Sequence, residues 1–220
     1  MSNAPLLKSS IAKKVAMALS GLFLMLFLAQ HFFINMTSVF SADVFNEISH
    51  FMGNNPLVQF VIQPILIIGV VFHFIMGIYL ENKNRSARPI KYVSYNGASN
   101  ASWASRNMII SGLVVLAFLG LHFYDFWFPE MDYKYITQMP LDETRYFEEL
   151  VHKFHSPVRT GLYCLSFVLL SLHLWHGFTS SFQSVGARRV SVGAENFGKA
   201  FATIIPFGFV FIALYHHFMG

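Results

Sequence analysis

Charged side chains are scarce in this chain. Of its 220 residues, 12% are charged and 55% are apolar. Soluble domains have about a quarter of their residues charged, so this chain has too few charges to solvate an ordinary protein surface. The apolar residues also fall in runs of about 20, the length that a helix needs to cross the hydrocarbon core of a bilayer. Both features predict a protein embedded in a membrane.

Cysteine is almost absent as well. The single cysteine, Cys164, lies within one of the apolar runs. One thiol cannot hold an iron–sulfur cluster, a structural zinc ion or an intramolecular disulfide. Histidine is plentiful by contrast, with 10 residues, several of them within the apolar runs. Any redox chemistry of this chain therefore depends on histidine rather than on cysteine.

Five apolar runs are long enough to span a membrane. They cover residues 12–35, 57–80, 107–128, 159–182 and 196–218. Segments rich in Asn, Ser, Pro and charge separate the runs, which is typical of connections. The first run is too long for the apolar part of a signal peptide, so we expect it to stay in the protein. The sequence therefore predicts an all-α, single-domain bundle of five transmembrane helices over residues 1–220.

The lysines and arginines predict the orientation of this bundle. Cytoplasmic loops carry an excess of these residues. If the N-terminus is cytoplasmic, the outer segments hold only Lys134, Arg145, Lys153 and Arg159 of the 15 lysines and arginines. The others then lie in the inner segments. We therefore expect a cytoplasmic N-terminus and a C-terminus outside.

Four of the predicted helices carry a histidine well inside the apolar run: His31, His73, His122 and His173. Because the helices alternate in direction, the first and third of these fall outside the bilayer centre and the other two inside it. The two levels lie roughly 11–18 Å apart along the membrane normal. Any one such histidine could simply bond a neighbouring helix. Two pairs at two depths instead predict two haems, each with two axial imidazoles.

Two of these helices share a Ser-Gly-Leu pattern. Ser20 and Ser111 each stand eleven residues before the histidine of their helix. Eleven residues are about three turns, so both serines should line the bundle near the inner haem. A hydrogen bond to the haem and close helix packing are both compatible with this pattern. His176, one turn beyond His173, is a further candidate for contacting the inner haem or replacing a ligand.

The fifth run carries histidines only at its end, His216 and His217. We expect both at the outer membrane interface, and we expect this helix to pack without ligating. His152 and His155 lie in the second outer segment, where we expect surface positions.

The histidines and their neighbours resemble a known family. Over nearly its full length, the chain resembles the di-haem cytochrome b subunit that anchors type B succinate dehydrogenases and fumarate reductases. The matching segments are Gln30-His31, His50-Phe51-Met52, His73 with Gly77 and Tyr79, His122, and His173 with Gly177. The resemblance implies that His31 pairs with His122 and His73 with His173, as the depths also indicate. Some members carry a glutamate two residues before the fourth ligand, where this chain has Ser171.

The resemblance also implies a function. Such a subunit sits in the bacterial inner (cytoplasmic) membrane and carries a flavoprotein subunit and an iron–sulfur subunit on the cytoplasmic side. It passes their electrons through two b haems to a quinone, here expected to be menaquinone. The chain has no flavin motif, nucleotide loop or cysteine cluster, so the dicarboxylate site is expected on the partners. The same anchor serves succinate oxidation and fumarate reduction.

Quinone chemistry needs groups that exchange protons near the outer haem. The candidates at the outer helix ends are Asn46, Glu47, His50, Tyr124, Asp125 and Trp127. Asp125 lies about one turn beyond His122, where we expect the outer interface. An interfacial aromatic belt would also explain Tyr124 and Trp127.

Two other functions remain open from the sequence alone. One is the quinone-reactive cytochrome b of another dehydrogenase, such as a formate dehydrogenase or a hydrogenase. The other is a membrane protein without redox function, for example a transporter with histidines near the midplane.

Overall fold

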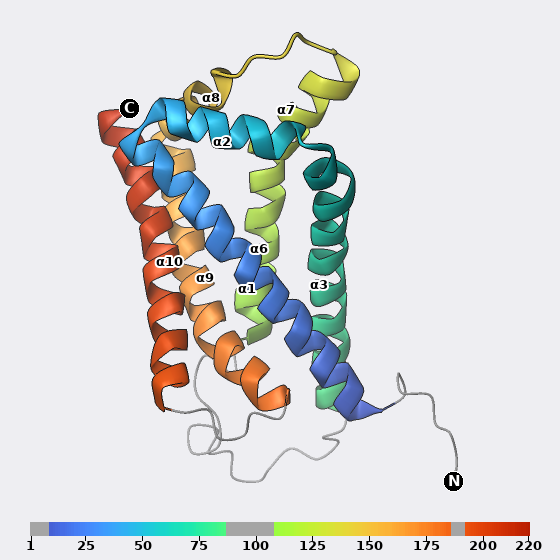
Figure 1. Ribbon diagram of the computed structural model, residues 1–220. Helices are drawn as coiled ribbons and strands as arrows, with labels where there is room; N and C mark the ends of the chain where they lie inside the picture. Colours follow the sequence, from blue (N-terminus) through green and yellow to red (C-terminus); the bar gives the residue numbers. More distant parts are fainter. Residues whose placement is uncertain (1–8, 87–107, 186–191) are drawn as a thin grey trace.

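The computed structural model describes residues 9–86, 108–185 and 192–220, and five long antiparallel helices form its bundle (Figure 1). These helices are α1 (Ser10–Phe40), α3 (Gln63–Ser86), α6 (Met108–His122), α9 (Pro157–Ser184) and α10 (Val192–Met219). Two shorter helices, α2 (Ala42–Asn54) and α8 (Arg145–Phe154), lie across one end of the bundle. The described residues form no strand, and the all-α prediction is confirmed.

The five predicted spans are confirmed as helices long and apolar enough to cross a membrane. The spans are Ser10–Phe40, Val58–Ser86, Met108–Ile136, Pro157–Ser184 and Gly193–Met219. The second includes a π turn, η2 (Val58–Ile62), before α3. The third passes well beyond residue 128, because α6 continues through the π turn η3 (Phe123–Trp127), α7 (Phe128–Met131) and the π turn η4 (Asp132–Ile136). Backbone hydrogen bonding thus continues past the end of the apolar run, which hydropathy alone does not reveal.

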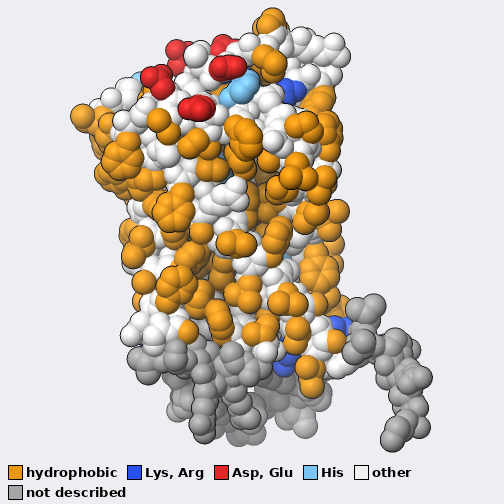
Figure 2. Space-filling model, viewed as in Figure 1, with side chains coloured by type: hydrophobic (Ala, Val, Ile, Leu, Met, Phe, Trp, Pro, Cys, Tyr) orange, Lys and Arg blue, Asp and Glu red, His pale blue; other side chains and the backbone are white. Residues whose placement is uncertain are grey.

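The flank of the bundle is apolar, whereas its α2/α8 end is polar. None of the residues of α3 is buried, and its exposed side chains include Ile65, Ile68 and Ile75. On the face shown in Figure 2, apolar side chains cover the flank and acidic ones gather at the α2/α8 end. Helices that expose apolar side chains while satisfying their own backbone groups suit a lipid environment.

The packed core lies between α1, α9 and α10. Phe209 of α10 has its ring centre 5.3 Å from that of Phe32 in α1 and 5.2 Å from that of Phe167 in α9. Ser171 of α9 donates a hydrogen bond to the carbonyl of Ala202 in α10, with 2.6 Å between the oxygens. Helices α3 and α6 contain no buried residue, so they flank this three-helix core rather than forming it.

Candidate functional site

His73 of α3 and His173 of α9 face each other within the bundle. Their ring centres lie 6.5 Å apart, with 73° between the ring planes. We call these two residues the inner pair. The helices that carry them are adjacent to α1 and α6, and each of those two helices supplies a serine to the pair.

Ser20 of α1 fixes the tautomer of His73. Its hydroxyl lies 2.8 Å from the carbonyl oxygen of Met17, to which it donates, and 3.0 Å from Nδ1 of His73. A hydroxyl has a single proton, so Ser20 must accept from Nδ1–H. The proton on Nδ1 leaves Nε2 of His73 with a free lone pair. A ligating histidine needs this state, with one nitrogen bonded and the other free.

Ser111 of α6 does the same for His173. Its hydroxyl donates to the carbonyl of Met108 at 2.9 Å and lies 3.2 Å from Nδ1 of His173. The two inner histidines therefore share one arrangement, contributed by two helices that are far apart in the sequence. The Ser-Gly-Leu pattern has a structural reason at both places.

The glycine of each pattern leaves room for the imidazole ring. A Cβ atom added at Gly21 would lie 3.3 Å from Cε1 of His73, and one at Gly112 would lie 3.5 Å from Cε1 of His173. The first distance is tighter than ordinary van der Waals contact between carbon atoms. Serine and glycine thus act together, one bonding the ring and the other letting its edge approach the backbone.

His31 of α1 and His122 of α6 form a second pair, nearer the α2/α8 end, which we call the outer pair. Their ring centres lie 5.8 Å apart, with 83° between the ring planes. Aromatic rings surround them: Phe27, Phe118, Phe126 and Phe209 each have a ring centre within 5.9 Å of one of the two imidazoles.

The outer pair lacks the serines of the inner one. Nδ1 of His122 is buried and has no hydrogen-bond partner among the described residues. The amide of Asn35 lies 3.5 Å from Nδ1 of His31, at the limit of a hydrogen bond, and donates to the His31 carbonyl at 2.8 Å. The outer imidazoles are therefore held chiefly by aromatic packing.

The ring separation of each pair matches the one that two imidazoles would need to share a single metal ion. A metal about 2 Å from one nitrogen of each ring would separate the ring centres by about 6 Å. The measured separations are 5.8 Å and 6.5 Å. Across the described residues, no group of three or more His, Cys, Asp or Glu side chains is arranged to hold a bare metal ion. A haem iron needs only two protein ligands, because the porphyrin supplies four nitrogens.

Two other histidines occupy notable positions. His176 is partly buried on α9, one turn from His173. His216 of α10 is fully buried, and its Nε2 lies 2.8 Å from the hydroxyl of Ser38 in α1. His216 was expected at the outer membrane interface; it lies at the α2/α8 end of the bundle, where its ring is enclosed by neighbouring helices. Helix α8 and the end of α1 cover it, and the ring of Phe147 in α8 stands 5.6 Å from its ring.

The candidates for quinone binding differ in their exposure. Glu47 is exposed on α2, and Tyr124 is 66% exposed on the flank. Asp125, expected at the outer interface, is 1% exposed and turns inward toward α9. Trp127 has a buried indole N–H without a hydrogen-bond partner among the described residues.

The remaining two candidates lie on α2. The side chain of Asn46 is buried, and its oxygen accepts a hydrogen bond from the backbone N–H of Phe147 at 2.8 Å. His50 is partly buried, with Nδ1 3.2 Å from the Asn54 amide and Nε2 3.7 Å from Glu143. Asn46 thus has a structural partner in α8, while His50 stands at the edge of a larger polar network.

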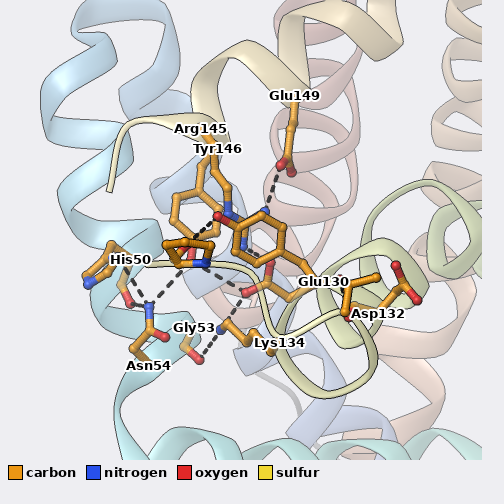
Figure 3. A network of polar contacts seen from close by, with 12 residues as sticks. His50, Gly53, Asn54, Glu130, Asp132, Lys134, Arg145, Tyr146 and Glu149 are labelled. Atoms are coloured by element: carbon orange, nitrogen blue, oxygen red, sulfur yellow. Dashed lines mark hydrogen bonds and ion pairs between the residues drawn. The ribbon is translucent and has the colours of Figure 1, made fainter. Parts of the chain in front are cut away.

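This network closes the α2/α8 end, and the sequence reading missed it (Figure 3). Arg145 of α8 pairs with Glu130 and, at 2.7 Å, with Glu149. Its guanidinium lies over the rings of Tyr133 and Tyr146, 4.1 Å and 4.3 Å from their centres. Burial alone would lower the pKa of Arg145, but its hydrogen bonds to the two carboxylates raise that pKa above its usual value.

Lys134 joins the same network from η4. It pairs with Glu130 at 2.5 Å and donates to the carbonyl of Gly53 in α2. Burial, followed by the nearby Glu130 carboxylate, raises the pKa of Tyr146. The network thereby connects α2, the end of the third span and α8 into one cap.

The chain is similar to a curated protein of a named complex. That protein is the succinate dehydrogenase cytochrome b558 subunit of Bacillus subtilis (strain 168), which is 22% identical over 160 residues. The aligned region covers 70% of this chain and 69% of that subunit. No family model matches the chain. No solved structure matches it.

Proposed function

We propose that this chain is the di-haem membrane anchor of a type B succinate:quinone oxidoreductase. His31 and His122 would hold the outer haem b, and His73 and His173 the inner one. The observation that carries the proposal is the presence of two facing imidazole pairs at two levels of one bundle, each with a ring separation that suits a shared iron. The distant similarity to a succinate dehydrogenase cytochrome b subunit supports the same function.

The residues around the pairs have definite tasks in this proposal. Bound haem would supply a one-electron carrier at each pair, and the two imidazoles of the pair would be the protein ligands of its iron. Ser20 and Ser111 hold the protons on Nδ1 and so present Nε2 of the inner histidines as ligands. The aromatic rings around the outer pair exclude water from it.

The proposed orientation puts the start of α1 in the cytoplasm of a bacterium, with the end of α10 outside. The excess of lysine and arginine in the segments at the first end supports it. The flavoprotein and iron–sulfur subunits would dock at that cytoplasmic end, and succinate would be oxidised on those partners. A reporter enzyme fused to each terminus tests the orientation. Activity of a periplasm-dependent reporter at the N-terminus would contradict it.

We further propose that a quinone, menaquinone in this case, reacts near the outer pair. A quinone takes up two electrons and two protons, so its site needs hydrogen-bond donors and a route to water. The unpaired, buried indole N–H of Trp127 is a donor that a quinone carbonyl would satisfy. His50 and the exposed Glu47 lie at the polar end, where protons can be exchanged with water.

A reduced-minus-oxidised spectrum of the purified complex tests the haem assignment. We expect two b-type haems per chain, together with co-purifying flavoprotein and iron–sulfur subunits. His73→Ala should remove one haem and His31→Ala the other, while His176→Ala, on the same helix as His173, should retain both. Absence of b-type bands from the wild-type protein would refute the proposal. Loss of the same haem from the first two variants would refute the pairing.

A further inference from the structure

A buried carboxylate lies just beyond the outer pair. Asp125 belongs to the π turn η3, which begins directly after His122. Its side chain has no exposure to solvent, and it stands near the end of the third apolar run. π turns inside helices are frequent at functional sites. We therefore looked for a functional role that would explain why this carboxylate is buried.

Two side chains of α9 hold this carboxylate. Arg159 pairs with one of its oxygens, and the Tyr163 hydroxyl donates to the other at 2.8 Å. The Arg159 side chain is 29% exposed, whereas that of Asp125 is fully enclosed. Solvent therefore screens the guanidinium charge more than the carboxylate charge.

Tyr163 also connects the carboxylate to the outer pair. It is 2% exposed, and its ring centre lies 6.4 Å from that of His122. Phe118 packs against both residues, with ring centres 5.1 Å from Tyr163 and 5.9 Å from His122. Tyr163 thus contacts both Asp125 and His122, and the three side chains lie in a region of low dielectric constant.

Stability alone explains this arrangement poorly. Buried ion pairs often contribute little net stability, because desolvation offsets their attraction. Within the described part of the chain, the hydrogen bonds of the inner histidines go to neutral serines, Ser20 and Ser111. The carboxylate is therefore a feature that distinguishes the outer pair from the inner one.

We propose that Asp125, held by Arg159 and Tyr163, is a positioning residue that lowers the reduction potential of the haem at His31 and His122. This inference rests on the proposed function. Reduction lowers the charge of the iron by one unit, so a nearby buried negative charge disfavours the reduced state. Arg159 offsets only part of this effect, since it is the more exposed partner.

Potentiometric titration of the purified complex, followed through the b-type bands, tests the inference. Asp125→Asn should favour the reduced outer haem about tenfold, which is about 59 mV for a one-electron couple. The inner haem should titrate as in the wild type and serves as an internal control. The His31→Ala variant identifies which band belongs to which haem. Asp125→Glu keeps the charge and should restore the wild-type potential.

The double variant Asp125→Asn with Arg159→Gln leaves no lone buried charge. It should raise the outer potential in the same direction as Asp125→Asn but by less, and it decides the question if the single variant does not assemble. The inference would be overturned if the reduction potential of the outer haem were unchanged in these variants, or if the potentials of both haems shifted equally. So would loss of the outer haem from both variants with retention in Asp125→Glu, which would show a structural role. Absence of haem from the wild type would instead refute the proposed function.

Discussion

Ser20 accepts a hydrogen bond from Nδ1 of His73 across 3.0 Å, although the two residues stand 53 positions apart in the chain. Ser111 repeats this relationship with His173 at 3.2 Å. In both cases the serine also donates its own proton to a carbonyl within its helix, so the direction of the bond to histidine is determined. These hydrogen bonds orient the inner imidazoles.

Ser20→Ala and Ser111→Ala should each weaken haem binding at the inner pair. A bond to Nδ1 fixes the ring and makes Nε2 more basic, and removing such a partner typically lowers metal affinity about 10–100-fold. We also expect the inner haem that remains to become easier to reduce, since a less basic ligand stabilises the oxidised iron less. Haem retention during dilution and the midpoint potential measure these effects.

Ser166→Ala provides the matched control. Ser166 also lies on a spanning helix and donates to a backbone carbonyl, that of Leu162 at 2.7 Å, but it bonds no histidine. It should leave both haems unchanged. If Ser20→Ala behaves like Ser166→Ala, the serine has no role in ligation.

Arg145→Met should destabilise the cap at the α2/α8 end. The change removes one of the two cations that pair with the mostly buried Glu130, and Lys134 remains as the other. Losing hydrogen bonds to a charged group costs about 1.5–3 kcal/mol. Arg85→Met is the control, because Arg85 pairs with Glu81 while its side chain is 69% exposed. Such exposed pairs contribute about 0–1 kcal/mol. The temperature at which the haem spectrum is lost measures the stability of both variants. Equal midpoint temperatures for Arg145→Met and Arg85→Met would contradict the structural role of the cap.

Ser38→Ala should destabilise the contact between α1 and α10. His216 is fully buried, and Nε2 bonded to Ser38 is its sole hydrogen-bonded nitrogen within the described part of the chain. Leaving a buried polar group unpaired costs about 1–3 kcal/mol. The same thermal assay measures the loss. The additional change His216→Phe should recover part of it, since it removes the unpaired group.

Trp127→Phe should raise the KM for quinone about three- to tenfold, because it removes one neutral hydrogen-bond donor while keeping an aromatic ring. Haem content and both haem potentials should stay as in the wild type. Tyr124→Phe removes a hydroxyl from the exposed neighbouring flank and should leave the KM unchanged. A Trp127→Phe enzyme with wild-type quinone kinetics would place the quinone elsewhere.

The sequence alone predicted the five spans, because long apolar runs report directly on the thickness of a membrane. It also singled out the histidines that form the two facing pairs, since alternating helix directions convert position in a run into depth. The Ser-Gly-Leu repeats pointed to the neighbourhood of the inner pair for the same reason. The length of a span and the depth of a residue within it depend on a single helix, because the rise per residue of that helix determines both.

Contacts between helices could not be predicted in this way. The sequence did not reveal that Asp125, in the π turn after His122, is enclosed with Arg159 and Tyr163 of α9 as its partners. The sequence also did not reveal that α8 and the end of α1 cover His216. A polar residue near a helix end can face water or a neighbouring helix, and only the packing of that neighbour decides between the two.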